Sequence, residues 1–183
     1  METTGNTKTT WTIDPAHSKV GFKIRHLMIS NVLGHFNEFE GTLQTVGNDF
    51  TSGEISFSMK TSSIDTGVAD RDAHLKSADF FDAEVHPLIT FKSTKVKNMG
   101  DEKYELTGDL TIRGISHPIT VSAEFGGVMT DPWGHVKAGF NIEGKLNRKD
   151  WGLNWNAALE AGGVVVGEDV KINCDIELLK STN

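Results

Sequence analysis

The chain has 183 residues, 25 acidic and 18 basic side chains, and a formal net charge of -7 at pH 7. This length fits one domain with a substantial core, and a negative chain without a Lys/Arg-rich run argues against nucleic-acid binding. Cys174 is the single cysteine, which excludes an intramolecular disulfide and a thiolate metal cluster.

The first residues, METTGNTKTTWT, are polar where a signal peptide would carry an apolar segment. No window approaches the ~18 apolar residues of a membrane span. We therefore expect a flexible tail over residues 1–10, a single domain over residues 11–180, and a cytoplasmic protein without stable membrane insertion. A periplasmic location is the alternative if a leader peptide has been removed.

Apolar and polar residues alternate with the period of a β-strand through most of the chain. Val20, Phe22 and Ile24 begin the pattern, which returns over residues 55–59, 89–91, 104–112, 119–125, 136–146 and 170–178. Such alternation is typical of antiparallel strands with one buried face, and about eight long strands tend to close into an up-and-down barrel. The pattern predicts an all-β barrel whose interior is either filled by side chains or open to a small ligand.

Glycines interrupt the predicted inward rows of this barrel. Where packing alone favours Val or Leu, the inward positions include Gly41, Gly108, Gly114 and Gly144. Glycine within a strand marks a bend, a bulge or a close approach by a ligand. The sequence therefore allows two explanations of these glycines: bends in the strands, or an internal cavity.

The segment DRDAHLKSADFFDAEVHPLITF, residues 70–91, breaks the strand pattern. Asp70 is a candidate helix cap, and Pro87 bars His86 from helical conformation, which predicts a short helical insertion near residues 70–82. Its apolar side chains need a partner surface, so the segment is predicted to be a lid over one end of the barrel, through Leu75, Phe80 and Phe81. A second break, residues 148–163, is predicted to form another element of the mouth.

Four stretches resemble, in order, the motifs of the YceI-like family of polyisoprenoid-binding proteins. They are WTIDPAHSKVGFKIRHL, DRDAHLKSADFFDAEVHPLITFKST, LTGDLTIRGISHPITV and LNRKDWGLNWN, and the resemblance runs from about residue 11 to 179. It implies an extended eight-stranded antiparallel lipocalin-like barrel with a helical insertion, holding a long isoprenoid or other lipid chain. Some relatives form dimers, so a homodimer is left open.

The seven histidines have no spacing typical of a metal or catalytic site. His26 continues the inward row of Phe22 and Ile24, either as a core histidine or as a ligand contact, whereas His86 and His117, each before a proline, are predicted to be turn residues. Cys174 falls on an inward row as a small apolar side chain. Three arginines lie near the ends of predicted elements, namely Arg71, Arg113 and Arg148. We expect each to contact either a polar lipid headgroup or solvent.

The predicted function is non-enzymatic binding, storage or transport of a long apolar lipid: a polyisoprenoid, an isoprenoid quinone or a fatty-acyl chain. No catalytic residue, metal or cofactor other than the lipid is expected. The alternatives are a small enzyme acting on an isoprenoid-like ligand, and a stress-related structural protein with a filled barrel. The predicted ligand-binding residues are Phe22, Ile24, His26, Phe57, Met59, Phe80, Phe81, Phe91, Leu110, Ile112, Val121, Phe140 and Ile142.

Overall fold

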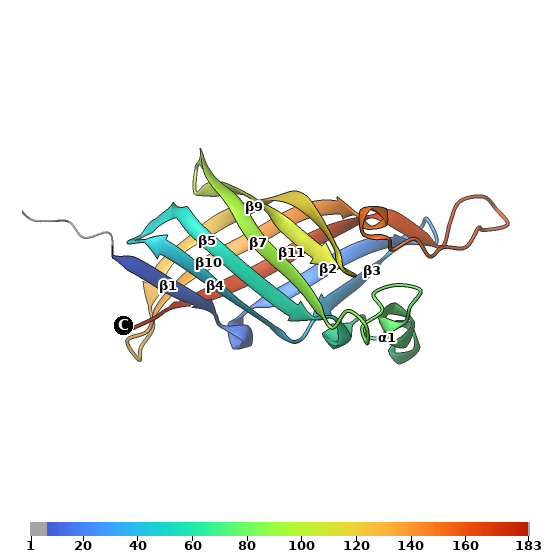
Figure 1. Cartoon of the computed structure of the whole chain (residues 1–183), viewed down its shortest axis with the longest axis horizontal. Coiled ribbons are helices and arrows are strands. Elements are labelled where there is room, and N and C mark those ends of the chain that lie inside the picture. Colours follow the sequence, from blue (N-terminus) through green and yellow to red (C-terminus); the bar gives the residue numbers. More distant parts are fainter. Residues whose placement is uncertain (1–6, 183) are drawn as a thin grey trace, which may run out of the picture.

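The computed structural model describes residues 7–182. Within that range eleven strand segments form one antiparallel sheet around a hollow interior, and a single α-helix lies at one end (Figure 1). The strands are β1 (Lys8–Ile13), β2 (Lys19–His26), β3 (Ser30–Phe36), β4 (Phe39–Val46), β5 (Asp49–Lys60), β6 (Ile64–Asp65), β7 (Leu88–Gly100), β8 (Lys103–Ile112), β9 (Ile115–Thr130), β10 (Val136–Asn147) and β11 (Val166–Lys180). The helices are α1 (Ala69–Lys76) and the 3₁₀ turns η1 (Pro15–His17), η2 (Thr61–Ser63) and η3 (Arg148–Trp151).

The eleven segments of the described chain make eight barrel strands, because three of these strands are broken in two. β1 and β2 lie end to end along β11, with Trp11 opposite Lys180 and Val20 opposite Cys174. β4 pairs with β1 and β3 pairs with β2, so β4 and β3 together form the next barrel strand. β5 pairs with β4 and β6 pairs with β3, so β5 and β6 form the strand after that. β7 to β11 then follow in chain order, and the pairing of β1 with β11 closes the barrel. The predicted eight-stranded antiparallel barrel is confirmed.

One end of the barrel is closed by aromatic side chains, and we call this cluster the floor. It consists of Trp11, Phe50, Tyr104, Phe125 and Phe140, with the Phe50 ring centroid 5.2–6.4 Å from three of the others and 5.8 Å from Trp11. Trp11 is fully buried and donates its indole N–H to Thr45 Oγ1 at 3.4 Å. These residues belong to β1, β5, β8, β9 and β10, and β1 begins at the end of the barrel where the C-terminus lies, opposite α1 (Figure 1).

Two predicted boundaries were wrong. Residues 8–10 belong to β1 and pair with residues 44–46 of β4, so the tail expected over residues 1–10 does not reach residue 10; residues 1–6 lie outside the described range. The helix covers two turns and ends at Lys76, because the chain then folds into hydrogen-bonded turns in which Phe81 N–H donates to Leu75 O. Its N-cap is Val68, and Asp70 lies inside the first turn without capping.

Three of the four glycines make room for a neighbouring side chain. A Cβ at Gly108 would lie 2.4 Å from Phe91 Cζ, and one at Gly144 would lie 2.5 Å from Val121 Cγ1. At Gly41 the corresponding contact is 2.7 Å, with Ile13 Cδ1, although Gly41 also lines the cavity. Gly114 is no inward strand residue: it has a φ of +73° in the turn between β8 and β9, a conformation that favours glycine. Close packing therefore explains most of this pattern.

No helix in the described part of the chain is long and apolar enough to cross a membrane.

Candidate functional site: the barrel cavity

The barrel encloses a cavity of about 590 Å³. It extends from the floor, where Phe50, Tyr104 and Phe140 line it, to the segment around α1, where Leu75, Phe80 and Phe81 line it. All thirteen side chains predicted to bind ligand lie on its wall. A barrel interior filled completely by side chains, one of the expected alternatives, is thus not what this chain forms.

The sequence prediction missed several wall residues. Val32 and Phe36 on β3 line the cavity, but in the sequence SNVLGHF the exposed position Leu33 is apolar and Gly34 separates the two wall residues, so the period-two signal is weak. Leu153 and Trp155 also line it, but they lie in an irregular segment after η3 where no period exists. Of the predicted second mouth element, residues 148–163, three side chains line the cavity: Arg148, Leu153 and Trp155.

The α1 segment covers the cavity end with apolar side chains. Phe80 is 6% exposed and its ring lies 5.4 Å from that of Trp155, while Phe81 contacts Phe36 edge-on at 6.1 Å. Exposed Asp70 on α1 and Arg25 at the end of β2 also line the cavity, which places an opening at this end. We call this region the mouth.

Two arginines hold the irregular segments of the mouth by donating to backbone carbonyls. Arg148 is 2% exposed and donates to the carbonyls of Gly167, Leu153, Trp155 and Val166 at 2.6–3.4 Å. Arg113, in the turn between β8 and β9, donates to the carbonyls of Phe80 and Gly152. Burial lowers the pKa of the Arg148 guanidinium, and the charge of Glu168 partly opposes that shift.

The histidines take several roles. His26 lines the cavity, and its ring has no hydrogen-bond partner among residues 7–182. His86 lies in a loop as predicted, but His117 was wrongly placed in a turn: it belongs to β9, pairs with Leu110, and packs its ring against Trp151. A proline follows His117 within β9, where Pro118 pairs with Asp109.

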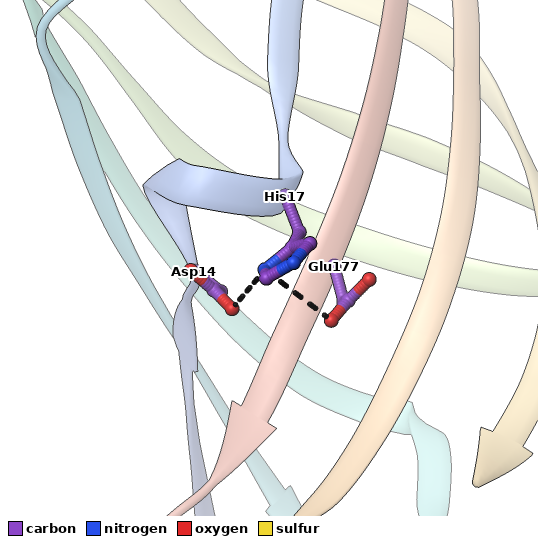
Figure 2. Close-up of side chains that lie close together, drawn as sticks. All are labelled: Asp14, His17 and Glu177. Atoms are coloured by element: carbon purple, nitrogen blue, oxygen red, sulfur yellow. Dashed lines mark hydrogen bonds and ion pairs between the residues drawn. The ribbon is translucent and has the colours of Figure 1, made fainter. Parts of the chain in front are cut away.

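A cluster not predicted from the sequence joins Asp14, His17 and Glu177 outside the floor (Figure 2). His17 Nδ1 lies 2.9 Å from Asp14 Oδ2 and 4.0 Å from Glu177 Oε1. Lys137 Nζ also lies 2.8 Å from Glu177 Oε1 and 3.3 Å from Asp14 Oδ2, so an ammonium already supplies the positive charge that a metal ion would bring. The cluster is an ion-pair network between η1, β10 and β11.

Cys174 behaves as a small apolar wall residue. It is 7% exposed, lines the cavity, and burial raises the pKa of its thiol to about 11. A thiol with a raised pKa is a poor nucleophile at neutral pH, which agrees with the predicted apolar role.

The geometry defines a lipocalin-like antiparallel barrel with a large apolar interior and a partly covered mouth. A model of the YceI-like domain matches residues 11–178, so the chain belongs to the YceI-like family. A UPF0312 protein of Staphylococcus epidermidis is 41% identical over 92% of this chain and 96% of its own length.

Solved structures show the same fold. The Campylobacter jejuni YceI protein is 32% identical with a TM-score of 0.72, covering 92% of this chain and 96% of that one. Burkholderia cenocepacia BcnA, at 22% identity, has a TM-score of 0.78 and covers 90% and 98% of the two chains. A polyisoprenoid binding domain from Saccharophagus degradans, at 13% identity, has a TM-score of 0.68 and covers 93% and 98%.

Proposed function

We propose that this protein binds one long apolar chain, such as a polyisoprenoid, an isoprenoid quinone or a fatty-acyl chain, inside the barrel without chemically changing it. The observation that carries the proposal is the cavity of about 590 Å³ with its predominantly apolar wall. Its size lies within the ~300–1,000 Å³ of known ligand pockets. The polyisoprenoid binding described for a structural relative supports the same class of ligand.

Binding of a long apolar chain at such a site requires few specific polar contacts. Each methylene removed from water contributes ~0.8 kcal/mol, so about ten methylenes beyond the costs of association give roughly 8 kcal/mol, near micromolar affinity. An apolar wall distinguishes chains by length and girth more than by chemical identity. Storage or transport follows if the mouth residues Leu75, Phe80 and Phe81 move aside to release the chain.

Filling the cavity tests the proposal. Ile142 on β10 lines the cavity, whereas Glu143, the next residue, is exposed. Ile142→Trp is expected to lower retention of a fluorescent long-chain probe at least tenfold, while the matched Glu143→Trp control leaves it unchanged. Native mass spectrometry of protein purified without detergent is expected to show a bound lipid that organic solvent extracts. Equal retention by both variants, with both folded, contradicts the proposal.

A further inference from the structure

The turn between β2 and β3 exposes three large apolar side chains in succession, and we call Leu27, Met28 and Ile29 the tip. All three are exposed, Ile29 to 78%. Ile29 N–H donates to His26 O at 3.2 Å, and Leu27 and Met28 have φ values of +52° and +65°, as in a type I′ turn. Such a turn favours Asn-Gly, and large side chains rarely adopt this conformation. Neither burial nor turn geometry explains these residues, which points to a role in binding.

The loop over residues 157–165 lies against the tip. A Cβ at Gly163 would lie 3.0 Å from Met28 Cγ, and Leu27 N–H donates to Val165 O at 2.8 Å. The loop has the sequence AALEAGGVV, with one charged residue. Figure 1 shows this loop, in orange-red, extending beyond the barrel at the end where α1 lies. Because Val165 lines the cavity, the tip and the loop form an apolar projection beside the mouth.

Three lysines form one row across the outer face of the barrel, and we call them the lysine row. Lys145 on β10 pairs with Lys171 on β11, which pairs with Lys23 on β2. The neighbouring residues Phe22 and Ile172 line the cavity, so the lysines face outward. Like charges directly opposite one another destabilise a sheet. The row therefore costs stability, and an anionic partner would offset that cost.

The surroundings of the lysine row are also positive. The row lines a groove whose charged residues are four lysines and two carboxylates: Lys19, Lys23, Lys145, Lys171, Glu143 and Asp175. Lys145 lies 3.5 Å from Asp169, whereas Lys23 and Lys171 form no ion pair within 4.0 Å among residues 7–182. Leu33, which pairs with Lys23, adds an exposed apolar side chain. This face is thus basic and partly apolar, although the whole chain has a formal net charge of -7.

The opposite end of the barrel lacks this combination. Met129 and Trp133 are exposed there, but Trp133 N–H donates to Asp131 Oδ1 at 2.9 Å. The ion-pair network outside the floor gathers three carboxylates around one lysine, namely Asp14, Asp131 and Glu177 around Lys137. The floor also closes the cavity at that end. An anionic surface is therefore favoured only at the end that carries the tip.

We propose that the tip docks on an anionic lipid bilayer, with the lysine row facing the charged surface and the mouth beside the membrane. Lys23 and Leu27 are four residues apart, roughly 13 Å at ~3.3 Å per residue. A tip that enters the bilayer surface therefore brings the row to within about 10 Å of it, the Debye length at 0.1 M salt. The tip then gains apolar burial and the row gains attraction to anionic lipids. The use of this contact to load or release a ligand rests on the lipid binding proposed above.

Vesicle flotation tests the docking. The two vesicle types are phosphatidylcholine alone and phosphatidylcholine with phosphatidylglycerol as one-third of the lipid. The wild type is expected to bind the anionic vesicles roughly tenfold more tightly, and added salt is expected to reduce the difference. Met28→Ser/Ile29→Ser is expected to weaken binding to the anionic vesicles at least tenfold. The matched control, Met129→Ser/Trp133→Ser, removes exposed apolar side chains at the opposite end and is expected to bind as the wild type does.

A second pair of variants tests the charge. Lys23→Gln/Lys171→Gln is expected to bind both vesicle types alike, and to fold, because it relieves a like-charge contact between strands. The control, Lys95→Gln/Lys97→Gln, removes two positive charges from exposed positions of β7 and is expected to keep the preference for anionic vesicles.

Equal binding of the two vesicle types by the wild type overturns the docking proposal, as does equal binding by the tip variant and its control. A dimer that depends on the tip and does not bind vesicles also overturns it, because the tip then contacts a second copy of the chain. Retention of a fluorescent long-chain probe in solution separates docking from the proposed function. A wild type that retains the probe but does not bind vesicles refutes docking alone, whereas one that binds vesicles without retaining the probe refutes lipid binding alone.

Discussion

The floor and the mouth close the two ends of one barrel in different ways. At the floor, side chains from the strands themselves pack against one another, with Trp11 fully buried and Phe50 7% exposed. At the mouth, apolar side chains come from turns and loops after α1 and η3, and arginines hold those segments through backbone carbonyls. Stability and ligand access are therefore separated between the two ends: the floor is part of the core, whereas the mouth segments can move without opening the sheet.

The largest expected effect is on stability, at the floor. Phe50→Ala removes a ring that contacts Trp11, Phe125 and Phe140, and is expected to lower the free energy of unfolding by about 3–5 kcal/mol. Trp133 is 80% exposed, so the control Trp133→Ala should change that free energy by less than about 0.5 kcal/mol. Urea unfolding measures both variants, and a floor variant as stable as the control would contradict the contribution of Phe50 to the core.

The next effect is on ligand retention, at the mouth. Replacing Phe80 and Phe81 together by serine removes the apolar cover and is expected to speed release of a fluorescent isoprenoid about tenfold, equivalent to a loss of ~1.4 kcal/mol. The far-ultraviolet circular dichroism of the sheet should persist, because both residues lie outside the strands. Release at the wild-type rate would remove the covering role from these side chains.

A third effect is expected in the barrel wall between the two ends, where an added side chain would overpack against Phe91. Gly108→Ala places a Cβ 2.4 Å from Phe91 Cζ and 2.5 Å from Lys92 O, so the Phe91 ring must move. Overpacking of this kind is expected to cost about 1–3 kcal/mol of unfolding free energy, measured in urea. The control is Gly139→Ala, where an added Cβ meets nothing within 4 Å. Similar unfolding midpoints for the two variants would contradict the packing explanation.

The smallest effect is expected in the ion-pair network outside the floor. The hydrogen bond from His17 lowers the pKa of Asp14 below its ordinary value of 3.8. A carboxylate with a lowered folded-state pKa stabilises the protein above its unfolded-state pKa, and this contribution is lost as the pH falls through the folded-state value. Asp14→Asn should therefore be less stable than the wild type at neutral pH.

That difference should shrink as the pH falls below 3.8, because the wild-type carboxyl is then also neutral. Thermal unfolding across the acid range measures the two proteins side by side. A difference that does not depend on pH would show that the charge of Asp14 contributes nothing to stability.

The sequence predicted the strands at both ends of the barrel and which of their faces is buried. Alternation at Val20, Phe22 and Ile24 identified one face of β2, and the same period located the wall residues of β8, β9 and β10. His117 was misplaced because the proline after it was taken for a turn signal, while the pairing of β9 with β8 tolerates Pro118. The helix was predicted too long because the turns after Lys76 carry Phe80 and Phe81 at nearly helical spacing.

The alternation of apolar and polar residues was enough to predict a closed antiparallel barrel with one apolar face turned inward, because a strand places alternate side chains on opposite faces. It could not determine whether the inner face packs solid or leaves space, since that depends on strand tilt and on which side chains meet across the barrel. The packing in three dimensions shows that aromatic side chains gather at one end, and that Arg113 and Arg148 hold the irregular segments of the other end through backbone carbonyls.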